Sequence, residues 1–346
     1  MKNDGLRHRR DFLKNAALFG GAAFAAGQLD TAFAQAAPDF VNHIGLELFT
    51  IRDVMGTPAD YEAALAKIAS FGYKEIEPAT GYAGLSPKDF RAMIDRYGLS
   101  CPSTHSGLPA GDTIEQRLEG AQVMGLLYVE NLGGGPGGGR GAGTGAGTGR
   151  AGTSGGGRGG MAAGGRGQGG GGRGAGQTEE AIKRQAQTLN ENGKVAQKFG
   201  LKMIVHNHTG EFAPLADKPE MRPYDVLLAE TDPALVVMQL DIGWASVAGQ
   251  DILGMFKKNP GRFECWHVED AMDLKMLSPD MTQQQRQQSA KLVPVGLGDV
   301  DYKSIFAAAS LAGMKHFCIE QDNANQWGDS LAAAKVSLQG LKKLLS

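Results

Sequence analysis

Cysteine and net charge are both scarce in this sequence, and each scarcity argues against a class of protein. Cysteine occurs only three times in 346 residues, at Cys101, Cys265 and Cys318. An odd number of cysteines, each inside or beside an apolar run, predicts buried small hydrophobic side chains rather than a disulfide framework. The net charge is −2, so the overall charge balance gives no support to a nucleic-acid partner.

Long hydrophobic runs are also missing from the chain after its N-terminal region. No stretch there approaches the ~20 apolar residues that a spanning helix needs. The N-terminus itself carries Arg9 and Arg10, then Phe-Leu-Lys, an uncharged apolar stretch and Ala-Phe-Ala at 32–34. This order predicts a twin-arginine signal peptide over residues 1–34, and a short buried helix is the alternative. We therefore expect export, to the periplasm, with no stable membrane anchor after cleavage.

Residues 133–176 contain no acidic and no aromatic residue. They are almost entirely glycine with small residues and five arginines, so they have too little apolar surface to offset chain entropy. We expect a disordered insert within a single barrel domain over 38–346. A polyanion-binding segment and a flexible lid are alternatives to a tolerated loop expansion.

The remaining sequence alternates apolar runs with helical patterns. Such alternation, counted eight times, predicts an α/β fold of the (β/α)8 barrel type, with the insert after the fourth strand. An open doubly wound sheet is the alternative, but no glycine-rich phosphate fingerprint lies between a strand and a helix. The expected strands are 44–50, 73–78, 99–105, 126–132, 201–207, 235–241, 262–267 and 315–321.

Acidic or imidazole side chains stand at the C-terminal ends of four of these runs. Asp241, His267 and Glu320 end three of them, and His206 or His208 ends a fourth. Because strand C-termini gather at one face of a barrel, we expect these groups to lie close together. Oxygen and imidazole ligands suit a divalent cation, so the pattern predicts a metal site at that face.

Other polar groups near the strand ends have more than one interpretation. Asp241 could instead cap a following helix, although that helix is expected to begin nearer Asp251. Asp270 lies within reach of His267 and could orient its imidazole. Three groups on earlier strand ends fit a functional role and a plain surface or ion-pair role about equally: Glu77, His105 and Glu130.

The segments around these positions resemble a known family. GLELFTIRD (45–53), HNHTGEF (206–212), LDIGWASVAGQD (240–251), GRFECWHVED (261–270) and the long segment 296–322 are similar to the xylose-isomerase-like TIM-barrel superfamily. Within it, the chain resembles the sugar phosphate isomerase/epimerase branch. The resemblance covers essentially all of the expected mature chain outside the insert.

The resemblance implies one divalent cation, Mn²⁺, Zn²⁺, Co²⁺ or Mg²⁺, on a sugar-processing enzyme. Its ligands would be His206, Asp241, His267 and Glu320. A base removes the proton beside the carbonyl of a keto or aldo sugar, and the enediolate is reprotonated at another face or carbon. Catalytic candidates are Glu320, His208 and His105, and substrate-contact candidates are Glu77, Glu130, Trp244 and Asp270.

Two positions depart from the sugar epimerases of this superfamily. They carry glutamate where this chain has His206, and histidine where it has Trp244. These departures favour a second outcome on the same site, elimination from a 3-keto-glycoside or inosose by a lyase or dehydratase. A non-catalytic carbohydrate-binding barrel is a further alternative. The superfamily's three-metal DNA-repair endonuclease fits poorly, because this chain has too few histidines. The sequence leaves the exact carbohydrate and the oligomeric state open.

Overall fold

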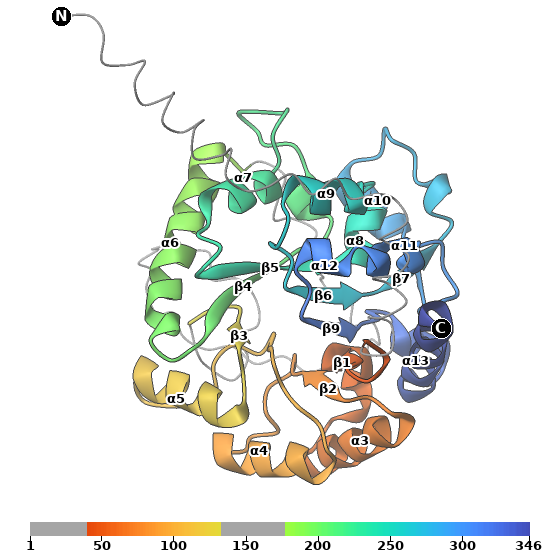
Figure 1. Ribbon diagram of the computed structural model, residues 1–346. Coiled ribbons are helices and arrows are strands. Elements are labelled where there is room, and N and C mark those ends of the chain that lie inside the picture. The colour runs from red at the N-terminus through yellow and green to blue at the C-terminus, as the bar shows by residue number, and fades with distance from the viewer. Residues whose placement is uncertain (1–39, 133–176) are drawn as a thin grey trace, which may run out of the picture.

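Seven parallel strands lie at the centre of the molecule, and helices surround them (Figure 1). The computed structural model describes residues 40–132 and 177–346. The strands follow one another in the order β2-β1-β9-β6-β5-β4-β3, and each neighbouring pair is parallel. Their bounds are β1 (Gly45–Glu47), β2 (Glu75–Glu77), β3 (Tyr128–Val129), β4 (Lys202–His206), β5 (Val236–Asp241), β6 (Cys265–Val268) and β9 (His316–Ile319).

Residues 100–102 join the two edge strands and so close the sheet into a barrel. Ser100 forms a parallel bridge with Glu75 of β2. The carbonyl of Pro102 accepts hydrogen bonds from two backbone N–H groups at the start of β3, at 2.8 and 3.0 Å. Proline has no N–H and cannot extend the ladder. The third expected strand, 99–105, is therefore reduced to a bridge, while the other seven expected strands form near their predicted places.

The helices begin and end at residues that the sequence marks. Thr57 and Asp60 form a capping box at the start of α3, and Gly72 ends that helix with φ 111°. Gly98, Gly200 and Gly313 also adopt positive φ at helix ends, where glycine carries no Cβ penalty. The α-helices are α3 (Pro58–Phe71), α4 (Pro87–Arg96), α5 (Ile114–Met124), α6 (Glu179–Gln197), α7 (Pro223–Glu230), α8 (Ile242–Val247), α9 (Ile252–Lys258), α10 (Gln283–Ser289), α11 (Tyr302–Ala307), α12 (Ala309–Ala312) and α13 (Ser330–Leu345).

Several short elements on the strand C-terminal side were not predicted. An antiparallel pair, β7 (Asp270–Met272) and β8 (Lys291–Val293), forms a second small sheet beyond β6. Helix α8 begins directly at the end of β5 and precedes the helix expected near Asp251, which forms as α9 with Asp251 as its N-cap. The 3₁₀ helices are η1 (Leu48–Val54), η2 (Gly210–Phe212), η3 (Leu274–Met276) and η4 (Ala324–Trp327).

The core fills the space between the strands and the helices. One large cluster of buried apolar side chains includes residues from every barrel strand, and Tyr128 of β3 belongs to a smaller cluster with Ile204, Val237 and Cys265. Trp266 of β6 stacks on Phe256 of α9, with ring centroids 5.3 Å apart. The three cysteines are free and buried, which confirms their interpretation as small core residues.

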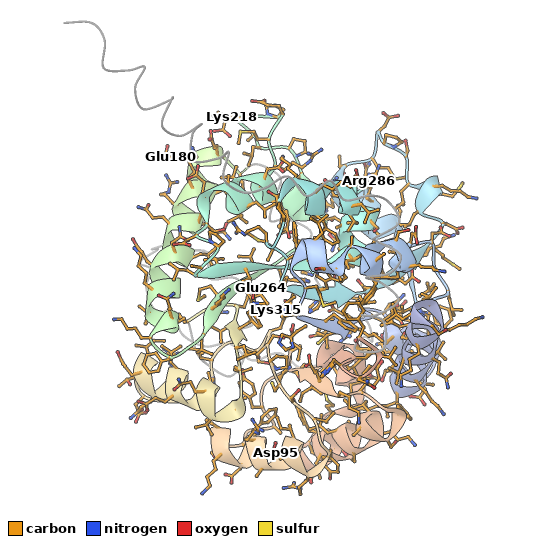
Figure 2. All side chains as sticks on the ribbon, viewed as in Figure 1. Asp95, Glu180, Lys218, Glu264, Arg286 and Lys315 are labelled. Atoms are coloured by element: carbon orange, nitrogen blue, oxygen red, sulfur yellow. The ribbon has the colours of Figure 1, made fainter. Side chains whose placement is uncertain are left out.

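A polar network occupies the opposite, N-terminal end of the barrel. Glu264 accepts hydrogen bonds from the Tyr128 hydroxyl at 2.8 Å, from Lys202 Nζ at 2.7 Å and from Lys315 Nζ at 2.8 Å. Figure 2 labels Glu264 and Lys315 next to each other beside the strands. The network ties the starts of β3, β4, β6 and β9 together.

Two sequence predictions fall outside the described residues. The signal peptide expected at 1–34 and the insert expected at 133–176 both lie there. Within 40–132 and 177–346, no helix has the length and apolar character needed to cross a membrane.

Candidate metal centre

Four side chains from four strand ends converge at the C-terminal face of the barrel. They come from β4, β5, β6 and the end of β9, and one ligand atom of each lies within 4.8 Å of the others. His206 Nε2 is 3.6 Å from Asp241 Oδ2, and His267 Nδ1 is 2.6 Å from Glu320 Oε2. The structure thus brings together the four residues that the sequence predicted as ligands.

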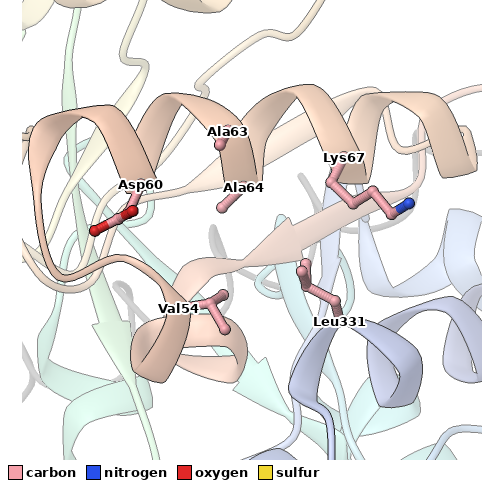
Figure 3. Close-up of a pocket in the computed structure, with 6 residues that line it drawn as sticks. All are labelled: Val54, Asp60, Ala63, Ala64, Lys67 and Leu331. Atoms are coloured by element: carbon pink, nitrogen blue, oxygen red, sulfur yellow. The ribbon is translucent and has the colours of Figure 1, made fainter.

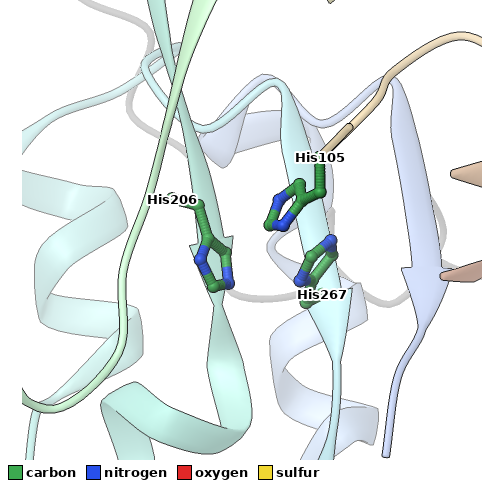
Figure 4. A group of neighbouring side chains, drawn as sticks. All are labelled: His105, His206 and His267. Carbon is green, nitrogen blue, oxygen red and sulfur yellow. The ribbon is translucent and has the colours of Figure 1, made fainter. Parts of the chain in front are cut away.

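The strand register explains this convergence. Asp241 of β5 pairs with His267 of β6, and His267 pairs with Cys318 of β9, two residues before Glu320. Side chains two residues apart on a strand face the same side. A third imidazole, His105, enters the same space, with its ring centroid 4.7 Å from that of His206 and 5.0 Å from that of His267. Figure 4 shows the three rings facing a common centre.

Asp241 has two roles, one for each carboxylate oxygen. Oδ1 accepts a hydrogen bond from the backbone N–H of Trp244 at 2.7 Å and caps α8, so the cap interpretation is correct as well. Oδ2 points to the cluster, where it meets no hydrogen-bond donor among the described residues. Gly243 permits this arrangement, because a Cβ there would collide with the carbonyl oxygen of Glu269.

Asn207 fixes the backbone at Asp241. Its side-chain oxygen accepts from the Asp241 N–H at 3.1 Å, and its side-chain nitrogen donates to the Asp241 carbonyl at 3.2 Å. This pair of bonds joins the ends of β4 and β5. The two ligands carried by these strands, His206 and Asp241, are thereby held at a fixed spacing.

Glu77 lies at the centre of the hydrogen bonds beneath the cluster. It is fully buried, and its Oε2 accepts from Ser103 Oγ and from Gln239 Nε2, the latter at 2.7 Å. Its Oε1 accepts from His267 Nε2 at 3.0 Å and lies 3.1 Å from His105 Nε2. Both oxygens are occupied by protein donors, so Glu77 orients two imidazoles. Its expected contact with a substrate stays a prediction.

The electrostatics of the cluster follow from burial and from an excess of carboxylates. Burial would raise the pKa of Glu77, but His105 and His267 outweigh it and lower the pKa to about 2. Burial would likewise lower the pKa of His267, yet Glu320 and Glu77 hold it well above its ordinary value. Burial and the neighbouring Glu320 raise the pKa of Asp241 well above its ordinary value. The cluster therefore carries more buried acid than its own cations neutralise.

These residues fit a divalent cation. Asp241 Oδ2 is buried and accepts no hydrogen bond from the described residues, and the buried Glu320 Oε2 faces His267 Nδ1 at 2.6 Å. His267 donates Nε2–H to Glu77, which leaves Nδ1 directed at these oxygens, the arrangement common to histidines that bind metal. Imidazole with carboxylate suits zinc and related divalent ions. A cation would also offset the excess negative charge.

The comparison with known families agrees with this geometry. The family model described as "Xylose isomerase-like TIM barrel" matches residues 161–344, which is more than half of the chain. The chain belongs to the xylose isomerase-like TIM barrel family. Members of this family include isomerases, epimerases and an inosose dehydratase.

Sequence relatives of this family member match only part of it. Inosose dehydratase from Clostridium tetani is 30% identical over 133 residues, which cover 37% of this chain and 43% of that enzyme. The chain thus spans less than half the length of this curated relative.

Solved structures match nearly the whole fold. A sugar phosphate isomerase/epimerase from Parabacteroides distasonis has a TM-score of 0.59 at 18% identity, covering 94% of this chain and 97% of that chain. The IOLI protein with a bound zinc atom has a TM-score of 0.55 at 12% identity, covering 88% and 98%. At these identities the likeness shows the fold.

Other predicted site residues of this family member lie near the cluster but make different contacts. Asp270 accepts four backbone N–H groups, from Gly296, Gly298, Val300 and Ala271, at 2.9 to 3.3 Å. Its carboxylate is thus used to hold residues 296–300, and the expected orienting contact with His267 is a wrong prediction. Both of its oxygens accept backbone N–H groups, and its expected contact with a substrate stays a prediction.

Trp244, His208 and Glu130 lie around the rim. Trp244 is buried, and its ring centroid is 6.2 Å from that of His208. His208 follows the end of β4, with its ring 4.8 Å from that of His206 and its backbone N–H bonded to Glu211 Oε2 at 2.8 Å. Glu130, after β3, is half-buried and forms no hydrogen bond or ion pair with the described cluster residues.

Several buried polar groups at this face were not predicted from the sequence. Glu47 ends β1 and Glu269 follows β6, and burial raises the pKa of both well above the ordinary value. Asp322 donates its N–H to Glu269 Oε1 at 2.8 Å, and burial beside Glu320 raises its pKa to about 7. The rule applied to the other strands, a polar residue after an apolar run, would have found Glu47. Gln239 stands two residues before Asp241, so alternation already placed it on the same face.

A separate hollow of about 310 Å³ lies on the helix layer (Figure 3). Its lining comes from η1, α3 and the start of α13: Val54, Asp60, Ala63, Ala64, Lys67 and Leu331. None of these residues belongs to the cluster, and the hollow offers no converging set of ligands.

Proposed function

We propose that this protein is a divalent-metal-dependent isomerase or epimerase that acts on a keto or aldo sugar. The observation that carries the proposal is the convergence of His206, Asp241, His267 and Glu320, with His267 oriented through Glu77. A bound divalent cation would polarise the sugar carbonyl and stabilise the charge that proton removal leaves. The family includes isomerases and epimerases, which supports this reaction class.

Three side chains are placed to move protons. Glu320 approaches His267, and although burial would raise its pKa, His267 keeps that pKa below the ordinary value. A carboxylate held ionised in this way is a weaker base than an imidazole near neutral pH. The rings of His105 and His208 both lie beside that of His206, with centroids 4.7 and 4.8 Å away. We therefore assign the metal-ligand role to Glu320 and proton transfer to the histidines.

The acidic surroundings favour a carbohydrate without phosphate. Glu47, Asp241, Glu269, Glu320 and Asp322 are all buried or half-buried at this face. Carboxyl groups offer a phosphate dianion no positive partner, and those that are ionised, such as Glu320, would repel it. We extend the proposal to a neutral or oxidised sugar in the periplasm, reached through the twin-arginine signal. Fusion of residues 1–34 to a reporter, with Arg9 and Arg10 replaced by lysine as control, tests that export.

Two measurements test the reaction. Elemental analysis of purified protein is expected to find about one divalent ion per chain. Incubation of the metal-loaded protein with keto sugars in heavy water is expected to place deuterium on the carbon next to the carbonyl. Metal-free protein that still binds sugar would overturn the proposal in favour of a non-catalytic barrel. Absence of exchange across a broad panel of keto sugars would count against the enzyme.

A dehydratase is the second candidate, and the inosose dehydratase match favours it. Both reactions begin with the same proton removal, but elimination then expels a hydroxyl or an alkoxyl group from the adjacent carbon. Product analysis separates them. An isomer of unchanged mass supports the isomerase, whereas a product lighter by one water, or a released aglycone, supports the lyase.

A further inference from the structure

Gln239 forms a link between His105 and Glu77 that the metal site does not need. Gln239 lies on β5, two residues before Asp241, and is almost completely buried. Its Nε2 donates to Glu77 Oε2 at 2.7 Å, and its Oε1 is 2.8 Å from His105 Nε2. The side chain therefore spans the barrel interior between a carboxylate and an imidazole.

The carboxylate determines which way the Gln239 amide faces. An ionised carboxylate only accepts hydrogen bonds, so the NH₂ group of Gln239 must face Glu77. The amide oxygen is then directed at His105, and an amide oxygen also only accepts. The reverse orientation would set oxygen against oxygen at Glu77.

His105 Nε2 thus lies between two acceptors, Gln239 Oε1 at 2.8 Å and Glu77 Oε1 at 3.1 Å. Its proton must sit on Nε2. In a neutral imidazole the other nitrogen, Nδ1, then carries the lone pair and points away from the buried acceptors. The His105 side chain is 17% exposed, against 0% for His267 and 5% for His206, so it is the most accessible ring of the three.

We propose that Gln239 is a positioning residue which, together with Glu77, fixes His105 as the Nε2–H tautomer and so makes His105 Nδ1 the proton acceptor of the site. The catalytic part of this inference rests on the proposed function. Nδ1 takes the proton from the carbon beside the sugar carbonyl, and the C–H electron pair moves into the enediolate. The resulting imidazolium is stabilised by Glu77, and it returns the proton to the product.

Nitrogen NMR of the zinc-loaded protein tests the tautomer without any substrate. Protein labelled with ¹⁵N-histidine is compared with His105→Gln to assign the His105 signals. We expect Nε2 to be of the protonated type and Nδ1 of the lone-pair type. A reversed pattern, or an imidazolium with both nitrogens protonated, would overturn the proposal.

Gln239→Met and Ser103→Ala form a matched pair. Each removes one donor from Glu77 Oε2, but only Gln239→Met removes an acceptor from His105. We expect Gln239→Met to give mixed His105 tautomers and to lower kcat at least about tenfold with little change in KM. Ser103→Ala should keep the single tautomer. If both variants, or neither, changed the tautomer, Gln239 would not be the positioning residue.

The two proposals fail in different ways. Absence of turnover in the zinc-loaded wild-type protein, with the expected tautomer present, would contradict the proposed function alone. A fixed tautomer in an active protein whose His105→Gln variant keeps full turnover would contradict the base role, since removal of a base costs on the order of 10²–10⁴-fold.

Discussion

Glu77 shows how much of this site depends on single side chains. Its two carboxylate oxygens contact Ser103, Gln239, His105 and His267, and its side chain has no exposed surface. A buried carboxylate is tolerated only when its acceptor capacity is filled, and here it is. The residue that looked like a substrate contact in the sequence is the group that orients the site.

Substitution of Glu77 by glutamine tests this orienting role. Glutamine has nearly the same size as glutamate, but its NH₂ group would face at least one hydrogen-bond donor. It also lacks the negative charge that stabilises protonated His267. We expect zinc affinity to fall about 10–100-fold, as for other partners that orient metal-bound histidines. A competition titration with a chelator measures it, with Ser103→Ala as the control expected to stay near wild type. Unchanged zinc affinity in Glu77→Gln would refute the role.

Asp241 allows its two roles to be separated. Asparagine caps helices about as well as aspartate, so Asp241→Asn should keep α8 while removing the ligand charge. We expect metal to be lost and the metal-free protein to unfold no more easily than wild type, since the pKa of Asp241 is raised by burial and its ionised form destabilises the folded state.

Asp241→Ala removes the helix cap as well, and this should lower the free energy of unfolding by about a further 0.5–2 kcal/mol. Elemental analysis and urea unfolding of the metal-free proteins compare the two variants. Retained metal in Asp241→Asn would show that Oδ2 is not a ligand.

At the scale of elements, Asp270 fixes the position of the loop 296–300 beside β7. Its carboxylate accepts N–H groups from Gly296, Gly298 and Val300, and a Cβ at Gly298 would collide with that carboxylate. The loop 296–300 is therefore held against β7 by one side chain. Hydrogen bonds to a charged acceptor are stronger than neutral ones.

Asp270→Ala is expected to lower the free energy of unfolding, because it leaves buried backbone N–H groups without an acceptor. Each such group costs roughly 1–3 kcal/mol, and water that enters the site offsets part of this cost. Amide hydrogen exchange should speed up at residues 296–300 and change little in α6. Metal stoichiometry should stay at the wild-type value. Loss of metal with unchanged exchange would instead restore the predicted contact between Asp270 and His267.

The sequence predicted elements better than their ends. Apolar runs located all eight barrel positions, because buried parallel strands read as continuous hydrophobic stretches. The missing N–H of Pro102 reduced the third strand to a bridge, which hydrophobicity alone does not reveal. Helix α8 was missed because Ile-Gly-Trp after Asp241 has no helical apolar spacing, and Gly243 is a weak helix former chosen here for close packing.

The four ligands could be predicted because apolar runs locate the strand ends. The residues that orient those ligands could not be predicted. A strand end fixes where a side chain emerges, so His206, Asp241, His267 and Glu320 could be named from the sequence. β4 ends at His206, and the ring of His208 still lies 4.8 Å from that of His206. Contacts across the barrel, such as Gln239 to Glu77, join residues 162 positions apart, and no local pattern predicts them.

At the scale of the whole molecule, the two ends of the barrel use charge differently. The C-terminal face collects acids around a proposed cation, whereas the N-terminal end balances Glu264 with Lys202 and Lys315. Burial would raise the pKa of Glu264, but hydrogen bonds from Lys202, Lys315 and Tyr128 hold it below the ordinary value. This network contributes to the stability of the fold and takes no part in the chemistry.

Glu264→Gln predicts a pH-dependent difference in stability. A carboxyl whose pKa is lowered on folding stabilises the folded state above its unfolded pKa, about 4.3, and that contribution is lost as pH falls through the folded value. The melting temperature of Glu264→Gln should therefore lie furthest below wild type at neutral pH and approach it below about pH 4. Thermal unfolding across pH 3–8, roughly the range that spans both values, checks this. A gap that widens in acid would contradict the assignment.

The shared oxygen Oε1 of Glu77 limits how this barrel can be re-engineered. One atom contacts two rings, that of the proposed metal ligand His267 and that of the proposed base His105, so neither ring can be reoriented alone. A substitution at Glu77 would disturb metal binding and proton transfer together. A change of sugar specificity would therefore have to be made in the loops above the strands.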